Sequence, residues 1–255
     1  MDRGEVLVGH WVTSVSPVAI EVMGYGGADF VAIDCEHGPI SALGDDLETC
    51  IRAADAAGVS AIVRISSHSA AEIAHAGDLG AKGVIVPHVN TAAELEVLLS
   101  RARFPPHGTR GCNPSVRAAR YGATPWAQFA RDSEETFTVV PLLEEPAAFE
   151  DLDALLDVAG LRAVAIGPFD LAARLGGVGA EGAARRVAEL RARLLAGCRR
   201  RSVSLIDAGA SVEAVKSKVQ DGVRGILYSA DVVLLADAMS ERMDHVRRFL
   251  RERRS

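Results

Sequence analysis

Residues 30–38 read Phe-Val-Ala-Ile-Asp-Cys-Glu-His-Gly, an apolar run that ends in charged side chains. A continuous apolar run of this length, without alternating polar residues, is typical of a strand in a parallel sheet that is covered on both faces. Ligands of such sheets bind outside the carboxyl ends of the strands. The segment therefore predicts a buried parallel strand that ends in a polar site.

Similar apolar runs recur along the whole chain and alternate with amphipathic, helix-like segments. The expected strands are Gly9–Thr13, Phe30–Asp34, Ala61–Arg64, Gly83–Pro87, Thr138–Leu143, Ala163–Gly167, Val203–Asp207 and Gly225–Tyr228. The expected helices include Leu43–Ala57, Ala70–Leu79, Thr91–Ala102, Ala147–Ala159, Ala183–Arg200 and Ser211–Gln220. Glycine, which ends helices in a left-handed conformation, stands before several strands, at Gly58, Gly80, Gly160 and Gly222.

Eight strand–helix units in 255 residues predict an α/β fold of the (β/α)8 TIM-barrel class, with one domain over residues 1–255. A doubly wound sheet is the competing architecture. A dinucleotide-binding turn places its glycines directly after a strand. Here the glycines precede a strand, at Gly24, Gly26 and Gly27, so this architecture lacks support. The long irregular region, 104–125, is rich in proline and glycine and is expected to be a functional or mobile loop.

Charge and cysteine content exclude several classes of protein. The net charge is −6, so no basic surface indicates a nucleic-acid or membrane partner. The four cysteines are scattered without a C-x-x-C spacing, which argues against a zinc cluster or a redox pair. No signal peptide and no apolar run of membrane-spanning length is evident. We therefore expect a cytoplasmic protein.

Ionisable residues gather after the carboxyl ends of the expected strands, which is where barrel enzymes carry their chemistry. Glu144 and Asp170 follow neighbouring strands, so both could reach one point above the barrel. Two carboxylates, completed by water and substrate oxygens, suit Mg²⁺ or Mn²⁺, with Co²⁺ as a further candidate. Glu145 is the alternative to Glu144, and either Glu144 or Asp170 could instead cap the helix that follows it.

Three further residues are candidates for acid–base or substrate roles. Arg64 ends an apolar strand and presents a planar fork to carboxylate or enolate oxygens, although a structural ion pair with Glu36 is the competing interpretation. His37 lies three residues beyond Asp34, whose carboxylate could fix the imidazole tautomer. A histidine without function in a surface loop is the alternative.

The lysines exclude one mechanism. Lys82 precedes a strand, and Lys216 and Lys218 lie in a late helix, so none follows the carboxyl end of a strand. A Schiff-base aldolase would lack its nucleophile. Any enolate must then be stabilised electrostatically, by a metal and Arg64.

The sequence resembles the HpcH/HpaI aldolases, the class II pyruvate aldolases, in six segments. They follow in order between about Gly9 and about Leu235, at residues 30–39, 62–64, 80–87, 104–111, 117–121 and 166–171. The resemblance implies a barrel of the phosphoenolpyruvate/pyruvate type. It also implies a lyase that forms a pyruvate-type enolate from a 2-oxo acid and adds it to an aldehyde, or releases it by retro-aldol cleavage.

The resemblance also implies roles for individual residues. Glu144 and Asp170 would be the metal ligands, Arg64 would steady the pyruvyl oxygen, and His37 with Asp34 would move protons, directly or through water. Asp78 matches an acid that reaches the site of a neighbouring subunit in relatives. Substrate contacts are expected from Arg64, Leu142, Gly167, Pro168 and Phe169. The family pattern predicts a homohexamer, a trimer of dimers that exchange their last helix, here Ala236–Arg251.

Two departures from the common aldolase pattern support other functions. Leu142 stands where many relatives carry glutamine, and the loop Gly111–Val116 differs from the usual aldolase form. This loop and the segment Gly9–Pro17 are more similar to a branch that includes a siderophore-pathway citrate synthase. The second hypothesis is accordingly a transferase that condenses oxaloacetate with acetyl-CoA. The third is a relative that keeps the metal site but has no aldol activity, or decarboxylates.

Overall fold

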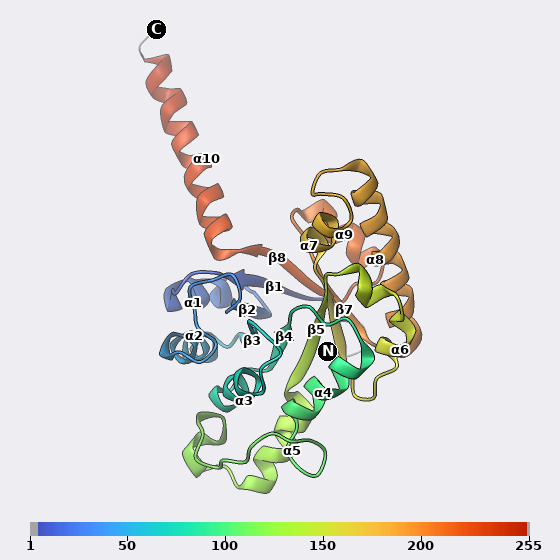
Figure 1. The fold of residues 1–255 in the computed structure, drawn as a ribbon. Helices are drawn as coiled ribbons and strands as arrows, with labels where there is room; N and C mark the ends of the chain where they lie inside the picture. The colour runs from blue at the N-terminus through green and yellow to red at the C-terminus, as the bar shows by residue number, and fades with distance from the viewer. Residues whose placement is uncertain (1–4, 254–255) are drawn as a thin grey trace.

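The computed structural model, which describes residues 5–253, confirms the (β/α)8 barrel (Figure 1). Eight parallel strands pair in chain order and close on each other, β1 against β8. Their bounds are β1 Leu7–Val12, β2 Phe30–Asp34, β3 Ser60–Arg64, β4 Gly83–Val86, β5 Thr138–Leu143, β6 Ala163–Ile166, β7 Ser204–Ala208 and β8 Gly225–Ala230.

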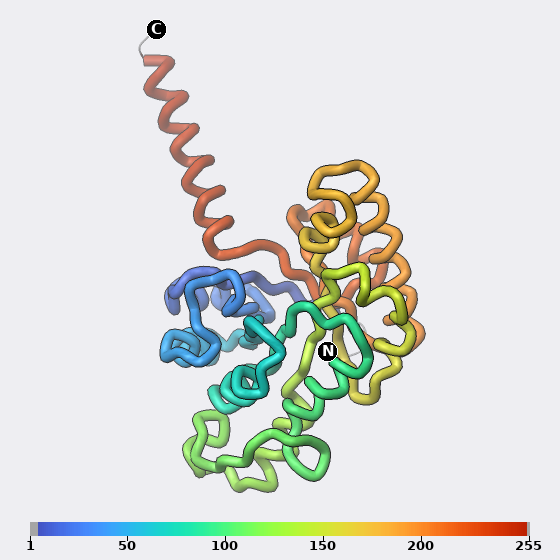
Figure 2. Tube along the Cα trace, viewed as in Figure 1, coloured from blue at the N-terminus to red at the C-terminus, as the bar shows by residue number. Residues whose placement is uncertain are grey.

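Helices surround the barrel on its outer side (Figures 1 and 2). They are α1 Pro17–Tyr25, α2 Asp45–Ala56, α3 Ala70–Leu79, α4 Ala92–Ala102, α5 Trp126–Thr136, α6 Leu152–Leu156, α7 Pro168–Arg174, α8 Glu181–Arg201, α9 Val212–Gln220 and α10 Asp231–Glu252. Local sequence sets their starts. Thr91 and Glu94 form a reciprocal capping box at α4, and Ser16 caps α1 ahead of Pro17. None of the helices described combines the length and apolar character needed to cross a bilayer.

The strands bury side chains on both faces, as their continuous apolar runs predict. The inward-facing side chains form one cluster, which includes Phe30 and Ala32 of β2, Val140 and Leu142 of β5, and Ile206 of β7. Their outward-facing neighbours join a larger cluster beneath the helices. Since successive residues of a strand alternate between faces, this pattern fixes which strand-end residues point into the barrel mouth.

Two parts of the chain differ from the sequence-based expectation. The helix expected over Ala147–Ala159 is a 3-10 turn, Pro146–Phe149, followed by the short α6. The region 104–125 contains a second 3-10 segment, Arg117–Gly122, and leads directly into α5. Short segments of this kind carry too little apolar periodicity to be recognised. The glycines that precede strands do adopt left-handed conformations, with φ of 101° at Gly80 and 90° at Gly222.

The last helix, α10, projects away from the barrel (Figures 1 and 2). Asp231 is its one buried residue among those described. The Asp231 carboxylate accepts hydrogen bonds from the backbone N–H groups and hydroxyls of Thr13 and Ser14, which follow β1. The start of α10 is therefore fixed to the carboxyl rim of the barrel, while the rest of the helix contacts little of its own chain.

Candidate active site

Asp34 and Arg64 form an ion pair at the carboxyl ends of two adjacent strands. β2 and β3 pair in a register that places the two residues side by side. Arg64 donates from Nε to Asp34 Oδ1 at 2.9 Å and from Nη2 to Oδ2 at 2.5 Å. Asp34 is 1% exposed. A two-point pair of this kind fixes the orientation of both side chains.

Arg64 also contacts two other residues of the rim. Its Nη1 lies 3.3 Å from Glu36 Oε2, and its guanidinium stacks on the Trp11 ring at 4.5 Å from the centroid. The ion pair with Glu36 that the sequence allowed is therefore present, together with a stronger one to Asp34. Arg64 is held as a fixed cation at the mouth of the barrel.

Burial would raise the pKa of the Asp34 carboxyl, but its partners outweigh that effect. The hydrogen bonds and positive charge of Arg64 lower the pKa, and the backbone N–H groups of His37 and Glu36 lower it further. The net shift is downward, so Asp34 is an anion at neutral pH.

The Asp34 carboxylate bonds to the backbone of His37 and not to its imidazole. Asp34 Oδ1 accepts the backbone N–H of His37 at 3.1 Å, and the His37 side chain is exposed. Asp34 thus shapes the loop that carries His37, while its own charge is neutralised by Arg64. Asp34 pairs with Arg64 because β2 and β3 align in this register. The residues around His37 carry no local pattern that would predict that register.

Glu144 is the acid that faces the barrel mouth. Val140 and Leu142 of β5 point inward, and the alternation continues to Glu144, just past the end of the strand. Glu144 is 3% exposed. Glu145 turns sideways and contacts Arg174 of α7 at 2.9 Å.

Gly167 leaves the space that Glu144 occupies. A Cβ at residue 167 would lie 2.7 Å from Glu144 Cβ and 2.9 Å from Glu144 Oε2. Gly167 precedes α7, where Pro168 is the first helical residue and Asp170 lies in the first turn. Asp170 and Phe169 are exposed, whereas Leu142 lies buried beneath Glu144 in the inward-facing cluster.

The environment of Glu144 is rich in negative charge. Burial raises the pKa of Glu144, and the charges of Glu36 and Asp170 raise it further, against the lowering effect of His88. The two carboxylates proposed from the sequence therefore interact electrostatically across the rim. A buried carboxylate near two other acids is a site that a cation would stabilise.

His88 was not assigned a role from the sequence, although it follows β4 at the same rim. Its Nδ1 lies 3.0 Å from Glu144 Oε1 and 3.1 Å from Glu145 Oε1, and its Nε2 lies 3.5 Å from Glu36 Oε1. His88 also has a left-handed backbone, with φ of 56°. This conformation is uncommon for a residue other than glycine, and φ cannot be read from the sequence.

Two other acids lie away from this group. Asp78 sits near the end of α3, which leads into the amino end of β4, and it pairs with the buried Arg110 at 2.6 Å. Asp207 ends the expected strand Val203–Asp207, but its side chain does not join the rim. It points outward between β7 and the helices, where its Oδ2 contacts Arg191 and Lys218, each at 2.6 Å.

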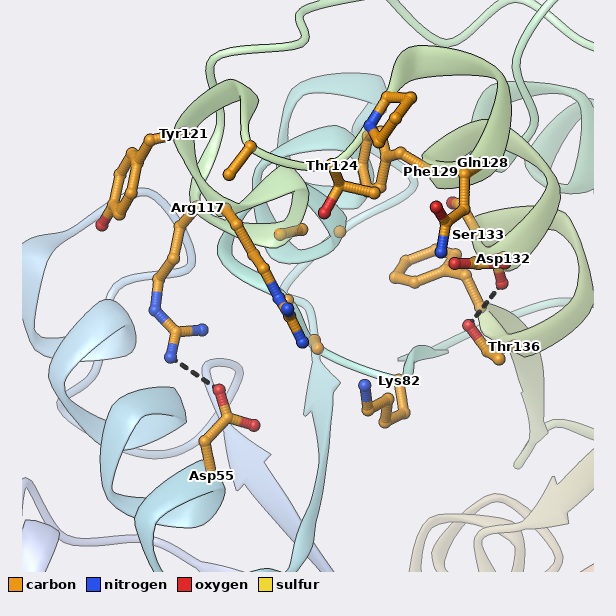
Figure 3. Close-up of a pocket in the computed structure, with 18 of the residues that line it drawn as sticks. Asp55, Lys82, Arg117, Tyr121, Thr124, Gln128, Phe129, Asp132, Ser133 and Thr136 are labelled. Carbon is orange, nitrogen blue, oxygen red and sulfur yellow. Dashed lines mark hydrogen bonds and ion pairs between the residues drawn. The ribbon is translucent and has the colours of Figure 1, made fainter.

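The cysteines and lysines have no part in this site. Burial raises the pKa of the Cys35 thiol to about 12, so it carries no thiolate at neutral pH. Lys82 precedes β4 and lines a separate cavity of about 850 Å³ between α2, α3 and α5, together with Arg117 and Gln128 (Figure 3). That cavity lies outside the barrel and away from the carboxyl rim.

The donor set at the rim fits a hard divalent cation. Glu144 and Asp170 offer carboxylate oxygens, which Mg²⁺ and Mn²⁺ prefer. Within residues 5–253, no three His, Cys, Asp or Glu side chains converge as a preformed metal cluster. Two carboxylates would fill only part of an octahedral shell, so water and substrate oxygens would complete it.

The fold and the acid-rich rim define a (β/α)8-barrel protein with a polar site at its carboxyl mouth. The model of the HpcH/HpaI aldolase/citrate lyase family matches residues 7–238. The chain belongs to this family. The aldolases among its relatives are carbon–carbon lyases, which supports aldolase-type chemistry for this chain.

Individual relatives agree with this assignment. The chain is 31% identical to the 2-dehydro-3,6-dideoxy-6-sulfogluconate aldolase of Pseudomonas putida over 179 residues, which are 70% of this chain and 69% of that protein. Other curated aldolases are matched over 64% and 66% of their length, so the chain spans about two thirds of these relatives.

Solved structures extend the likeness over nearly the whole chain. An HpcH/HpaI aldolase/citrate lyase family protein from Burkholderia cenocepacia has a TM-score of 0.89 at 28% identity, and each chain covers 96% of the other. The citrate synthase SbnG has a TM-score of 0.86 at 24% identity, covering 96% of this chain and 94% of that one, and shares the fold.

Proposed function

We propose that this protein is a metal-dependent, class II aldolase that forms a pyruvate-type enolate from a 2-oxo acid. One observation carries the proposal. Glu144 is buried at the barrel mouth, and its pKa is raised by burial and by the charges of Glu36 and Asp170. This concentration of negative charge is costly without a counter-ion, and a divalent cation held by Glu144 and Asp170 would provide it.

When bound, the cation supplies Lewis-acid stabilisation to the developing enolate. The chain's own residues then orient the substrate and handle the proton. Arg64, fixed by Asp34 and Trp11, directs positive charge at the mouth toward a carboxylate or enolate oxygen. His37 has an exposed imidazole at the same rim and can accept a proton from C3 of the 2-oxo acid through a water molecule.

The test is exchange of the methyl protons of pyruvate in D₂O, followed by NMR with and without Mn²⁺ or Mg²⁺. We expect metal-dependent exchange in the wild-type protein and its loss in Glu144→Gln. Glu135→Gln is the matched control, because Glu135 is exposed near the end of α5, which leads into the amino end of β5 and not to its carboxyl rim. Exchange at the wild-type rate in Glu144→Gln would disprove the proposal.

A second candidate is condensation of oxaloacetate with acetyl-CoA. It is supported by Leu142, which gives the site an apolar floor beneath Glu144 where many aldolases carry a glutamine. Release of the CoA thiol with oxaloacetate and acetyl-CoA, compared with turnover of pyruvate and an aldehyde panel, distinguishes the two reactions. Metal binding with no turnover in either assay would favour the third hypothesis, a non-aldol relative.

We also propose that the protein assembles as a trimer of dimers whose subunits exchange α10. The helix, about 33 Å long at 1.5 Å per residue, exposes an apolar row to solvent. Helix α1 likewise exposes Val18, Val22 and Tyr25. The exposed apolar residues of α10 are Val232, Val233, Leu234, Leu235, Met239, Met243, Val246, Phe249 and Leu250.

An unpaired apolar surface of this kind favours burial against a second copy. Asp78 lies away from its own rim and is 32% exposed beside Arg110, so it would then be the acid that faces a neighbouring subunit's site. Light scattering of Met239→Glu should show loss of the dimer, whereas Glu241→Lys, on the same helix, should leave the assembly unchanged. An unchanged mass for Met239→Glu would refute the exchange.

A further inference from the structure

The histidine after β4 contacts one oxygen of Glu144 with both its backbone and its ring. The His88 backbone N–H donates to Glu144 Oε1 at 2.9 Å, and His88 Nδ1 lies 3.0 Å from the same atom. One residue can present both groups in one direction because its backbone is left-handed, with φ of 56°. This conformation is uncommon for a residue other than glycine, so the surrounding structure must favour it.

The other oxygen of Glu144 is left without such a partner. Among the described residues, no hydrogen bond reaches Glu144 Oε2. This oxygen lies against Gly167, at the start of the helix that carries Asp170. The two oxygens are therefore differentiated. Oε1 is held on the β4 side by His88, and Oε2 lies on the α7 side, beside Gly167.

The remaining contacts of the imidazole keep it in place. Nδ1 also lies 3.1 Å from Glu145 Oε1, which Arg174 holds at 2.9 Å, and Nε2 faces Glu36 Oε1 at 3.5 Å. Acidic groups thus face both ring nitrogens, so the ring has little freedom to leave Glu144. The side chain is nevertheless 45% exposed, which puts it within reach of the open mouth.

We propose that His88 is a positioning residue for Glu144, holding Oε1 so that Oε2 alone is offered to the divalent cation shared with Asp170. The inference rests on the proposed function, since it concerns the same metal site. Residues that orient a metal ligand in this way typically change metal affinity by about 10- to 100-fold when they are removed. His88 would then set the affinity without touching the cation.

Two substitutions separate the imidazole from the backbone contact. His88→Gly keeps the backbone N–H and tolerates the left-handed conformation, so it removes only the ring. His88→Asn also tolerates this conformation, and its Nδ2 restores a side-chain donor close to the position of Nδ1. The matched control is His107→Gly, because His107 makes a similar contact to Glu134, 2.8 Å long, on an exposed loop away from the rim.

Binding of Mn²⁺ to the substrate-free protein, measured by the EPR signal of free Mn²⁺, provides the readout. We expect the Kd of His88→Gly to rise about 10- to 100-fold, that of His88→Asn to stay near the wild-type value, and that of His107→Gly to be unchanged. Wild-type affinity in His88→Gly would overturn the inference. So would an affinity of His88→Asn as weak as that of His88→Gly, because donation by the side chain would then be irrelevant.

Crystal structures without metal separate failure of this inference from failure of the proposed function. If the wild-type protein binds no Mn²⁺, the proposed metal chemistry is wrong. The positioning role is then decided by the orientation of Glu144 in wild-type and His88→Gly crystals. A carboxylate that rotates away from residue 88 in the variant supports the role, and one that keeps its position refutes it.

Discussion

Replacing Arg64 with methionine tests the ion pair on which the site geometry depends. Asp34 is 1% exposed and accepts two N–H groups from Arg64. In Arg64→Met the carboxylate keeps only the backbone N–H groups of Glu36 and His37. Breaking a buried pair by removing one partner costs about 3–5 kcal/mol. The two remaining donors favour the lower end, so we expect a loss of about 3 kcal/mol, or roughly a 100-fold change in the unfolding equilibrium.

The loss should depend on pH with a defined sign. In the wild-type protein the folded-state pKa of Asp34 is below its ordinary value, so the stability it contributes is present at neutral pH and is lost as pH falls through the folded pKa. In Arg64→Met the uncompensated burial raises that pKa above its ordinary value. The deficit of the variant should therefore be largest near pH 7.5 and should shrink as the pH falls toward 5.

Urea unfolding followed by circular dichroism, at one fixed protein concentration, measures both effects. Asp34→Asn supplies the double-mutant cycle, and Arg64→Met should cost less than about 1 kcal/mol in that background. Arg174→Met is the control, because the Arg174 side chain is 47% exposed and its ion pair with Glu145 should contribute less than about 1 kcal/mol. An equal loss from Arg64→Met in both backgrounds would show that Asp34 and Arg64 are not coupled, and the reasoning would fail.

Three further predictions follow from individual contacts. Gly167→Ala should weaken Mn²⁺ binding about 10-fold or more, because the added Cβ would lie 2.9 Å from Glu144 Oε2. In the control Gly111→Ala, the added Cβ would meet nothing within 4 Å, so the Kd measured by EPR should be unchanged. Asp231→Asn should be less stable than wild type in urea at pH 7 and equal to it at acidic pH, because the lowered folded pKa of Asp231 stabilises the fold only above that pKa; a constant difference across the pH range would contradict this. Gly80→Ala, at φ of 101°, should lower the free energy of unfolding by about 1 kcal/mol, and an unchanged Tm in calorimetry would count against it.

The sequence by itself determined the barrel and the rim that carries the site. Each strand is a short, continuously apolar run, and this pattern depends only on neighbouring residues, so it can be read along the chain. The placement of Glu144, Arg64 and Asp34 at the carboxyl mouth follows from the same pattern, because every parallel strand ends at one rim.

Only the tertiary structure decided which of these residues meet. Because of the register between β2 and β3, Asp34 pairs with Arg64 and not with the His37 imidazole. The alternation of side chains along β5 turns Glu144, and not Glu145, into the barrel mouth. The left-handed backbone of His88 allows the loop after β4 to contact Glu144 as well. Asp207, at the end of a similar run, faces outward. Contacts across strands depend on register, closure and single backbone angles, which are set by packing of the whole barrel and leave no local pattern in the sequence.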